Sequence, residues 1–595
     1  MLNVNNNLHR MEVRINNQII QAAEGTTIME ACRLAGIHVP SLCYLKDVSQ
    51  NASCGVCVVE VKGAKSLLRS CITRVTGGME IMTNSARAME ARKLNVELLL
   101  ANHPQDCLIC DRNGNCELQE LTFTLGINEK RFVRTRKEHY EKDESSLSLV
   151  RDPEKCILCG RCVAVCSNVQ NVKAIDFSGR GLKTRVSTFL DAGLGQVPCT
   201  NCGQCALVCP TGAITEKSSV AEVRALLHHP EKVVLVQTAP AIRVGIGEAM
   251  GMPFGSLVTG QMVAGLRRLG FTKVFDTNFA ADLTIVEEGS ELLRRIQTGG
   301  RLPMITSCSP GWIKFIEHFY PEQLDHLSTC KSPQQMFGAV AKTYYAEKTG
   351  IDPRDIVVVS IMPCTAKKYE ARRPEMDGAY LYWKERLHLT EEERFYDVDY
   401  SLTTRELARM FREAGIAFAK LPEEAFDNPL GESTGAAVIF GSTGGVMEAA
   451  LRTAYELYTG EKLGSVDFQS VRGLQGIKEA DVNLNGTILK VAVANTLKNA
   501  GLLLDQIKNG TSPYSFIEIM TCPGGCLGGG GQPIPTNAEI REKRAASIYL
   551  EDAHKAIRKS HENPEIIRIY EDFLKEPLGE RSHHLLHTHY QERGY

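Results

Sequence analysis

Residues 156–166 read CILCGRCVAVC, and residues 199–210 read CTNCGQCALVCP. Each stretch has its four cysteines in the spacing C-x2-C-x2-C-x3-C. A disulfide framework would spread its cysteines through a small secreted domain, whereas these thiols stand in tight clusters. Thiolates at such spacings are typical ligands of soft metals. The two stretches therefore predict that the front of the chain is built around iron or zinc.

The repeated spacing is that of bacterial ferredoxins with two 4Fe–4S clusters, in which the fourth cysteine of each run binds the other cluster. One cluster is therefore expected on Cys156, Cys159, Cys162 and Cys209. The second is expected on Cys166, Cys199, Cys202 and Cys205. Proline follows Cys209, as is usual for the pattern, whereas Ser167 follows the first run.

The composition of the whole chain agrees with a metal-rich protein. It has 595 residues and 21 cysteines, most of them before residue 210. So many thiols suit a reducing compartment only when they bind metal. The length predicts about four domains.

The charge balance and hydropathy exclude several functions. The chain has 68 Lys and Arg against 70 Asp and Glu, so it lacks the basic excess of a nucleic-acid binder. No apolar run is long enough to predict a membrane span. The first residues show neither an apolar signal core nor a twin-arginine motif, which predicts a cytoplasmic protein.

Four cysteines near the N-terminus follow a predicted hairpin and helix. Residues 11–22 alternate apolar and polar side chains about a turn at Asn16-Asn17, and residues 27–36 read as a helix ended by Gly36. We expect a 2Fe–2S cluster in a ferredoxin-like β-grasp module, similar to the one at the front of complex I and hydrogenase subunits. A structural zinc ion is the alternative. The ligand pattern is Cys43-x10-Cys54-x2-Cys57-x13-Cys71.

A third ligand pattern follows a predicted helix. Leu94, Leu98 and Ala101 recur at helical spacing, and Pro104 ends the helix. One imidazole and three thiolates would then hold a 4Fe–4S cluster, and a neutral histidine in place of a thiolate raises the cluster's potential. The pattern is His103-x3-Cys107-x2-Cys110-x5-Cys116.

The pattern changes to α/β in the back half. Residues 129–150 are charged and predict a solvated connector. Beyond it, short apolar runs alternate with helical stretches, which predicts a large α/β catalytic domain behind an α+β front. The expected strands are KVVLVQTAP (232–240), RLPMITSC (301–308), DIVVVSIMPC (355–364), AAVIFGS (436–442) and LKVAVA (489–494).

Three cysteine motifs follow these runs, where open α/β sheets place their sites. They lie at residues 306–312, 362–368 and 520–533, and glycines flank Cys522 and Cys526. Such glycines let the backbone approach a bulky ligand. The chain has no phosphate-binding G-x-x-x-x-G-K motif, and Gly245-x-Gly247-x3-Gly251 has the wrong spacing for a dinucleotide site. Flavin and nicotinamide are therefore expected on partners.

The three motifs resemble the signatures of FeFe-hydrogenases, and the similarity covers essentially the whole chain. The active centre of that family, the H-cluster, is a 4Fe–4S cubane joined through one cysteine to a diiron unit with CO, cyanide and an azadithiolate bridge. The resemblance implies reversible conversion of protons and electrons into H2. Cys526 matches the bridging cysteine, and Cys364 and Cys522 match other cubane ligands. Lys367 matches a lysine that hydrogen-bonds a cyanide, with pocket neighbours Ala239, Pro240, Pro333, Gln334, Met362 and Met520.

The first motif departs from the family pattern. FeFe-hydrogenases usually have two consecutive cysteines here, the first relaying protons and the second ligating the cubane. Aligned without a gap, Cys308 takes the relay position and Ser309 the ligand position. Ser309 ligates, or Cys308 replaces it and the relay is lost, or that iron has another ligand. We favour a relay retained through Cys308.

The resemblance also implies a proton route to Cys308. Its members are Glu288, Glu291, Arg295 and Ser328. The first three lie along one helical face, a pattern that alone would favour a charged solvent-facing surface.

Some residues are left over. We expect Cys32 to be a small core residue, Cys330 to be a bystander thiol, and the histidines of SHHLLHTHY (582–590) to be structural or solvated.

The expected domains are a 2Fe–2S domain (1–84), a module whose 4Fe–4S cluster has one histidine and three cysteine ligands (85–128), a linker with a two-cluster ferredoxin domain (129–220), an H-cluster domain (221–557) and a C-terminal wrapping segment (558–595).

The modular order most resembles the catalytic subunit of NAD(P)-linked, electron-bifurcating hydrogenases. This implies one 2Fe–2S cluster, three 4Fe–4S clusters and an H-cluster. It also implies flavin- and NAD(P)-binding partners, a small iron–sulfur subunit, and ferredoxin. A stand-alone ferredoxin-dependent hydrogenase and a non-catalytic H2 sensor are the alternatives.

Overall fold

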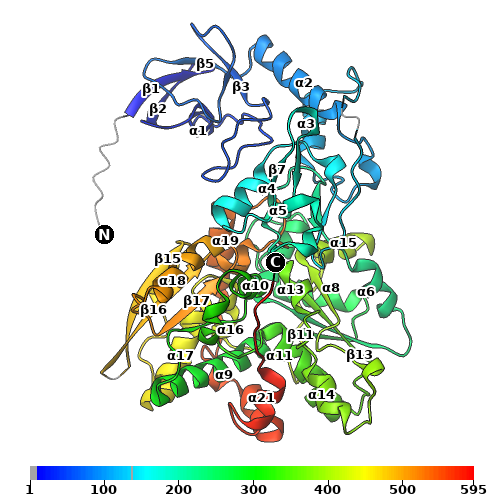
Figure 1. The fold of residues 1–595 in the computed structure, drawn as a ribbon, viewed down its shortest axis with the longest axis vertical. Helices are drawn as coiled ribbons and strands as arrows, with labels where there is room; N and C mark the ends of the chain where they lie inside the picture. The colour runs from blue at the N-terminus through cyan, green and yellow to red at the C-terminus, as the bar shows by residue number, and fades with distance from the viewer. Residues whose placement is uncertain (1–9, 136–137, 485, 595) are drawn as a thin grey trace.

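The computed structural model describes residues 10–135, 138–484 and 486–594. Figure 1 shows the front of the chain at the top of the long axis and the α/β body below it, with the segment that contains α4 and α5 between them.

The first module is a five-stranded mixed sheet. Its turn at Asn16 and Asn17 has φ of 44° and 69°, so the predicted hairpin forms with a left-handed turn. Helix α1 (Ile28–Leu34) begins at a Thr27 capping box and is followed by Gly36, as predicted. In sheet order the strands are β2 (Gln18–Ala23), β1 (Arg10–Ile15), β5 (Glu80–Met82), β3 (Val58–Val61) and β4 (Leu68–Arg69).

Helix α2 (Ala86–Ala101) forms where it is predicted but buries a different face. Leu94 and Leu98 are exposed, while Ala88, Arg92 and Val96 are buried. Arg92 explains this choice, because it donates hydrogen bonds to the carbonyls of Val58 and Thr83 and so holds α2 against the sheet. Helix α3 (Glu117–Thr124) follows the loop of residues 103–116.

The two cysteine runs at residues 156–166 and 199–210 lie on short elements. They are α4 (Arg161–Ala164), β7 (Asp176–Ser178), β8 (Arg185–Ser187) and α5 (Gln204–Val208), with β6 (Leu149–Arg151) paired to β9 (Ile214–Glu216). The expected connector 129–150 is mostly exposed, but Ser146 and residues 148–150 are buried, so its end belongs to the core. Residues 136–137 lie outside the described residues.

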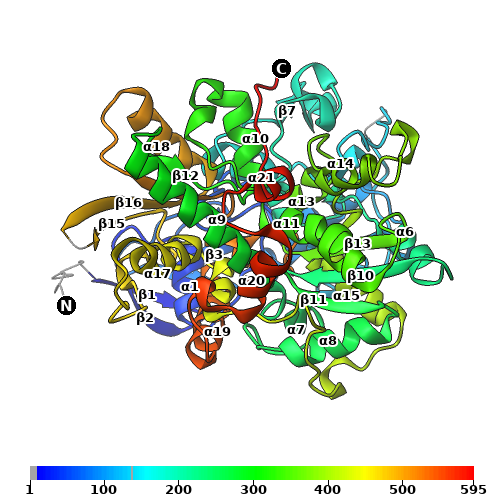
Figure 2. The same cartoon turned by 90° about the horizontal axis from the view of Figure 1, so that it is seen from below.

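Two four-stranded sheets form the body. The first is fully parallel, and the second is parallel except for its edge strand β15. The strand order of the first sheet is β11 (Lys273–Asp276), β10 (Val233–Thr238), β13 (Ile356–Met362) and β14 (Tyr400–Thr403). The strand order of the second sheet is β12 (Met304–Ile305), β17 (Phe516–Met520), β16 (Thr487–Asn495) and β15 (Ile477–Leu484). Figure 2 shows α9 (Thr277–Thr298) and α11 (Pro333–Val340) between them.

One predicted strand is wrong. AAVIFGS is helical, as α16 (Gly435–Val438) followed by a 3-10 turn at Ile439–Gly441. A short buried apolar run does not by itself separate a strand from a buried helix. The buried Asp282 carboxylate accepts hydrogen bonds from the amide and hydroxyl of Thr434 and so stabilises a helix start there. The other four runs are strands.

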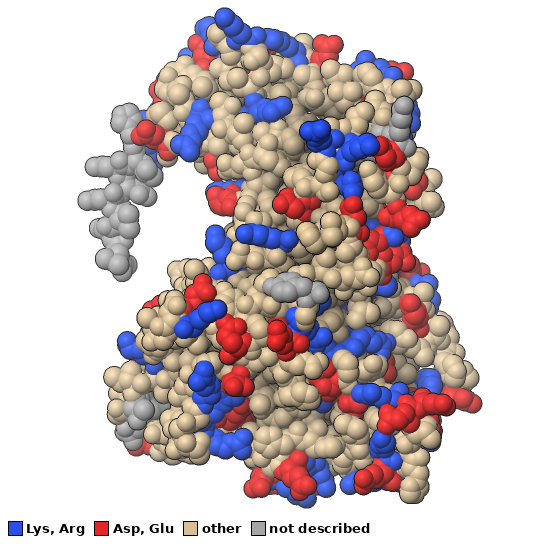
Figure 3. Space-filling view, in the orientation of Figure 1, with Lys and Arg blue, Asp and Glu red and all other residues tan. Residues whose placement is uncertain are grey.

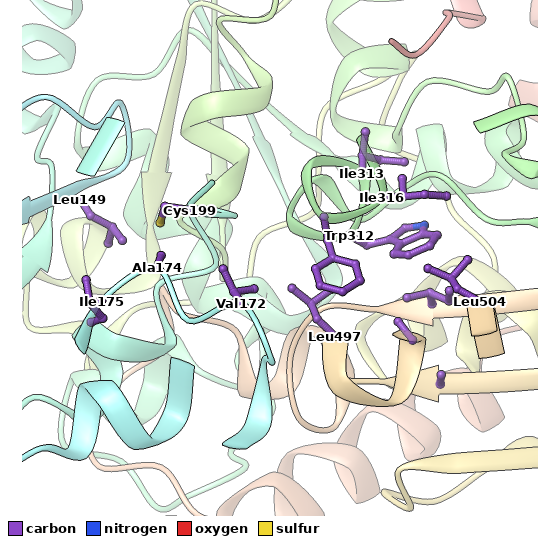
Figure 4. Packing of buried hydrophobic residues seen from close by; sticks show 14 of the residues in the cluster. Leu149, Val172, Ala174, Ile175, Cys199, Trp312, Ile313, Ile316, Leu497 and Leu504 are labelled. Atoms are coloured by element: carbon purple, nitrogen blue, oxygen red, sulfur yellow. The ribbon is translucent and has the colours of Figure 1, made fainter. Parts of the chain in front are cut away.

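A continuous apolar cluster joins the ferredoxin-like segment to the body. Figure 4 shows Val172 of the front near Leu497 and Trp312 of the body, and Leu149 lies farther out in the same cluster. Trp312 is fully buried, and its indole N–H donates to the carbonyl of Thr306. The two parts therefore share one core rather than touching through a wet interface.

The C-terminal segment packs over the body. After α19 (Ala538–His554), it contains α20 (Pro564–Ile569) and α21 (Glu580–Leu586), and Figure 2 shows α20 and α21 running beside α9 and α11. The face in Figure 3 carries interspersed Lys/Arg and Asp/Glu. Among the described residues, no helix combines the length and apolar character needed to span a bilayer.

Candidate active site

The three cysteine motifs meet at the carboxyl ends of β12, β13 and β17. Their loops surround one cavity of about 80 Å³, several times the roughly 10–15 Å³ that one water needs. Twelve residues singled out in the sequence line it: Ala239, Pro240, Cys308, Ser309, Pro333, Gln334, Met362, Cys364, Lys367, Met520, Cys522 and Cys526.

The glycine run after Cys526 lets these loops approach one another. A Cβ on Gly529 would lie 2.0 Å from the carbonyl oxygen of Pro363, and one on Gly531 would lie 3.0 Å from the amide nitrogen of Cys364. A Cβ on Gly530 would lie 2.2 Å from the carbonyl oxygen of Cys202. Contacts this short leave no space for a side chain, so only glycine allows the second and third motifs and the ferredoxin-like segment to meet here.

The chemistry of the cavity wall fits an iron–sulfur group. Burial raises the pKa of Cys526 to about 12 and that of Cys522 well above its usual range, with neighbouring thiols adding to the effect. Such buried thiols ionise only when a cation takes the place of their protons. Soft thiolates in an otherwise apolar pocket suit iron.

Ser309 faces the third motif. Its hydroxyl lies 2.7 Å from the Thr521 hydroxyl and accepts a hydrogen bond of 3.3 Å from the Thr521 amide. It therefore stands beside Cys522 on the cavity wall, with an oxygen that already has partners. Thr521 has no motif role, so no pattern in the sequence indicated it.

Lys367 stands in a polar network at the cavity wall. Its ammonium donates to the Cys308 carbonyl at 3.1 Å and to the Glu370 carboxylate at 2.9 Å. Glu370 also accepts from Ser332 and Gln334, so it fixes both Lys367 and Gln334. Sequence reasoning missed Glu370, although its spacing three residues after Lys367 on α13 (Ala366–Glu370) was a usable signal.

The predicted proton route is buried rather than solvent-facing. Glu288 and Glu291 on α9 are 1% and 3% exposed. Ser328 donates to Glu291 at 2.9 Å, and Arg295 donates to it at 2.6 Å. Burial and then the charge of Glu291 raise the pKa of Glu288 to about 8. One oxygen of Glu288 lacks a hydrogen-bond partner among the described residues.

The front thiols cluster as the sequence pattern predicts. The sulfurs of Cys43 and Cys54 lie 3.4 Å apart and those of Cys57 and Cys71 lie 3.3 Å apart. These separations suit pairs of ligands on two metal ions. A cavity of about 20 Å³ is lined by one predicted crossed quartet, Cys156, Cys159, Cys162 and Cys209. The buried thiol of Cys205 has Cys202, Cys199 and Cys166 as neighbours, and these four residues are the other predicted quartet.

His103 also fits a metal ligand. It lines a cavity with Cys107 and Cys116, whereas Cys110 is not among the lining residues. Its buried Nδ1 has no hydrogen-bond partner among the described residues, and burial lowers the pKa of the ring. A neutral imidazole with an unused nitrogen is the form that binds metal.

Hydrogen bonds join both N-terminal modules to the ferredoxin-like segment, and that segment to the body. Asn51 of the first module donates to the Cys159 carbonyl at 2.8 Å, and Arg161 bonds Ser41 and Glu117. At the other end, Gln204 donates to the Gly528 carbonyl at 2.9 Å. The loops that carry the thiols therefore contact one another from the first module to the cavity.

This chain of thiol-lined sites, ending at a buried cavity in an α/β body, is that of a multicluster iron–sulfur oxidoreductase. Residues 232–530 match the family model described as the C-terminal domain of the iron-only hydrogenase large subunit, and residues 538–593 match the iron hydrogenase small subunit. The chain belongs to the FeFe-hydrogenase family, whose members act on H2.

The front matches three further models. They are a 2Fe–2S binding domain (9–86), the iron–sulfur region of the NADH-ubiquinone oxidoreductase G subunit (92–131) and a 4Fe–4S dicluster domain (155–213). The chain thus carries 2Fe–2S and 4Fe–4S domains ahead of the hydrogenase domain.

Two relatives that align with this chain over nearly their whole length are also hydrogenases. The NADP-reducing hydrogenase subunit HndD of Solidesulfovibrio fructosivorans is 51% identical over 98% of this chain and 99% of its own. Iron hydrogenase 1 of Clostridium pasteurianum is 41% identical over 97% of this chain and 99% of its own. A structure of the FeFe-hydrogenase HydA1 from Chlamydomonas reinhardtii has TM-score 0.56 and 45% identity, covering 64% of this chain and all of that one.

A substitution at Ser309 tests directly whether its hydroxyl ligates the cubane. If Ser309 Oγ binds iron, Ser309→Cys replaces a hard oxygen with a soft thiolate, and the EPR g-values of the reduced cubane should shift. Ser307→Cys is the matched control, because Ser307 bonds the Cys330 carbonyl and does not line the cavity. Unchanged g-values in Ser309→Cys would contradict ligation by Ser309.

Proposed function

We propose that this hydrogenase interconverts protons and H2 at an H-cluster held by Cys364, Cys522, Cys526 and Ser309, with Cys308 as the neighbouring proton donor. The observation that carries the proposal is that these residues and the pocket neighbours named from the sequence line one cavity. When bound, the diiron unit would supply the bond-making and bond-breaking chemistry. The protein would hold it, exclude water and deliver protons.

The proton route runs along α9 in this proposal. Glu288, with a pKa of about 8, is protonated at neutral pH. Because this pKa lies close to neutral pH, the carboxyl can both give up a proton and take one up. It lies between Cys308 and the pair of Ser328 and Glu291. Arg295 donates two hydrogen bonds to Glu291 Oε1, which holds that carboxylate at the surface end of the route.

Lys367 positions charge at the cavity wall. Its hydrogen bonds to Cys308 O and Glu370 fix the ammonium beside the cavity, where it would stabilise an anionic ligand of the diiron unit. Glu370 therefore acts as a positioning residue.

Electrons would pass through the front clusters to or from partner subunits that hold flavin and NAD(P), with bifurcation to ferredoxin. The 51% identity to an NADP-reducing hydrogenase subunit over nearly the whole chain supports a multisubunit complex. A cytoplasmic location stays a prediction.

Infrared spectroscopy of matured, anaerobic protein tests the H-cluster. CO and cyanide stretching bands that respond to H2 are expected, and Cys526→Ala should remove them. Cys32→Ala is the control, since Cys32 lies fully buried in the first module's core and should leave the bands unchanged. Matured, iron-replete protein without these bands would refute the proposal.

Glu291→Gln tests the proton route. The amide keeps the shape of the side chain but cannot carry a proton, so H2 turnover should fall by about 10²-fold or more while iron content is unchanged. Glu347→Gln is the control, because Glu347 lies exposed on α12 (Ala346–Thr349) and outside the route. Turnover within twofold of the parent enzyme would remove Glu291 from the route.

Purification of the native complex tests the partners. We expect flavin-bearing subunits to co-purify and H2 to reduce NAD(P)⁺ in the isolated complex. A single chain that exchanges electrons with ferredoxin alone would favour a stand-alone hydrogenase. A protein with intact clusters but no H2 turnover would favour a sensor.

A further inference from the structure

Two residues left over from the cysteine and histidine patterns lie together beside the proton route. Cys330 and His587 form an isolated antiparallel bridge between the body and the C-terminal segment. The flanking amides fix it, with Lys331 N donating to Leu586 O at 2.7 Å and Thr588 N donating to Thr329 O at 2.8 Å. Both side chains are buried.

With Glu291 they form a compact set of three different ligand atoms. Cys330 Sγ lies 3.9 Å from Glu291 Oε2 and 4.0 Å from His587 Nδ1, and all three atoms lie within 4.8 Å of one another. Tetrahedral zinc with bonds of about 2.0–2.3 Å places its ligand atoms roughly 3.5 Å apart. The two separations from Cys330 Sγ therefore need to contract by about half an ångström to close around an ion, and the Glu291–His587 separation by at most about 1.3 Å.

The histidine is already oriented as a metal ligand. His587 Nε2 lies 3.1 Å from Glu287 Oε2, and Glu287 also accepts hydrogen bonds from Tyr570 Oη and the Leu578 amide. A carboxylate on the outer nitrogen keeps the proton there and leaves Nδ1 as an acceptor, which is the usual second contact of a metal-binding histidine. The Thr329 hydroxyl lies 2.8 Å from Nδ1, and it can rotate away.

An ion has a way in. Glu291 and His587 line a surface-open cavity together with Arg295, Thr329, His583 and His589. Cys330 lies behind this mouth. The fourth position of a tetrahedral ion would face the cavity, where water or an exposed histidine can occupy it.

We propose that Glu291, Cys330 and His587 form a Zn²⁺ site at the outer end of the α9 route. Thiolate, imidazole and carboxylate together favour zinc over the hard cations Mg²⁺ and Ca²⁺. The consequence for turnover rests on the proposed function: zinc on Glu291 occupies the carboxylate that exchanges protons with solvent. Micromolar zinc then acts as a reversible inhibitor.

The site is tested on cluster-loaded holoenzyme titrated anaerobically with ZnCl2, with iron content followed throughout. One equivalent should bind, and its zinc-edge X-ray absorption should show a single sulfur at about 2.3 Å with nitrogen and oxygen neighbours. Cys330→Ala should lose the sulfur contribution, and His587→Ala, made in case the first variant does not fold, should lose the binding step. The controls are Cys32→Ala, a buried thiol elsewhere, and His584→Ala, an exposed histidine on α21.

Turnover provides the second readout. Zinc should lower the H2 turnover of the parent enzyme and both controls at least tenfold, and EDTA should restore it. Each of Cys330→Ala and His587→Ala should change less than twofold relative to its own zinc-free rate. Absence of a sulfur-bound equivalent, or a titration unchanged by both variants, overturns the site. Sulfur-bound zinc without inhibition leaves the site standing and instead contradicts the route through Glu291.

Discussion

The close approach of three loops at the glycine run 528–531 is the contact on which the rest of the site depends. Gly529 and Gly531 lie against the second motif, and Gly530 lies against the Cys202 carbonyl of the ferredoxin-like segment. One short stretch therefore fixes the cavity wall and its distance from the nearest front thiols. A side chain at Gly530 would force the two apart, which would weaken both ligation and electron transfer.

The second constraint is the burial of carboxylates on α9, each of which needs a partner. Asp282 is bonded by Thr434 and Asn563, and Glu287 is bonded by His587 and Tyr570. Most of these partners come from residues after 558. The C-terminal segment therefore does more than cover the body: it supplies hydrogen-bond partners to the buried carboxylates of the helix that would carry the proposed proton route. Glu288 differs: burial and then the charge of Glu291 raise its pKa, and one of its oxygens has no hydrogen-bond partner among the described residues.

Local spacing predicted the parts of the structure that ligation dictates. The crossed quartet around Cys156 and Cys209 could be read from the sequence because the repeated spacing is that of two-cluster ferredoxins, in which the fourth cysteine of each run binds the other cluster. The helical run at 436–442 and the buried face of α2 could not, because Asp282 and Arg92 decide them from distant positions. The pairing of Cys330 with His587 joins residues 257 apart in the chain, beyond the reach of any local pattern.

These contacts place the electron path and the proton path of the proposed reaction on different parts of the cavity wall. Cys522 and the glycine run lie toward Cys202 of the ferredoxin-like segment, whereas Cys308 has Glu288 of α9 as a neighbour. Ser309 bonds Thr521, the residue before Cys522, and so stands on the electron wall although it follows Cys308 directly. A serine at this position therefore alters the environment of the cubane while the thiol of Cys308 keeps its place toward α9. In the proposed site, proton delivery through Cys308 would thus be retained beside a serine, because the two adjacent residues have different neighbours: Thr521 for Ser309 and Glu288 for Cys308.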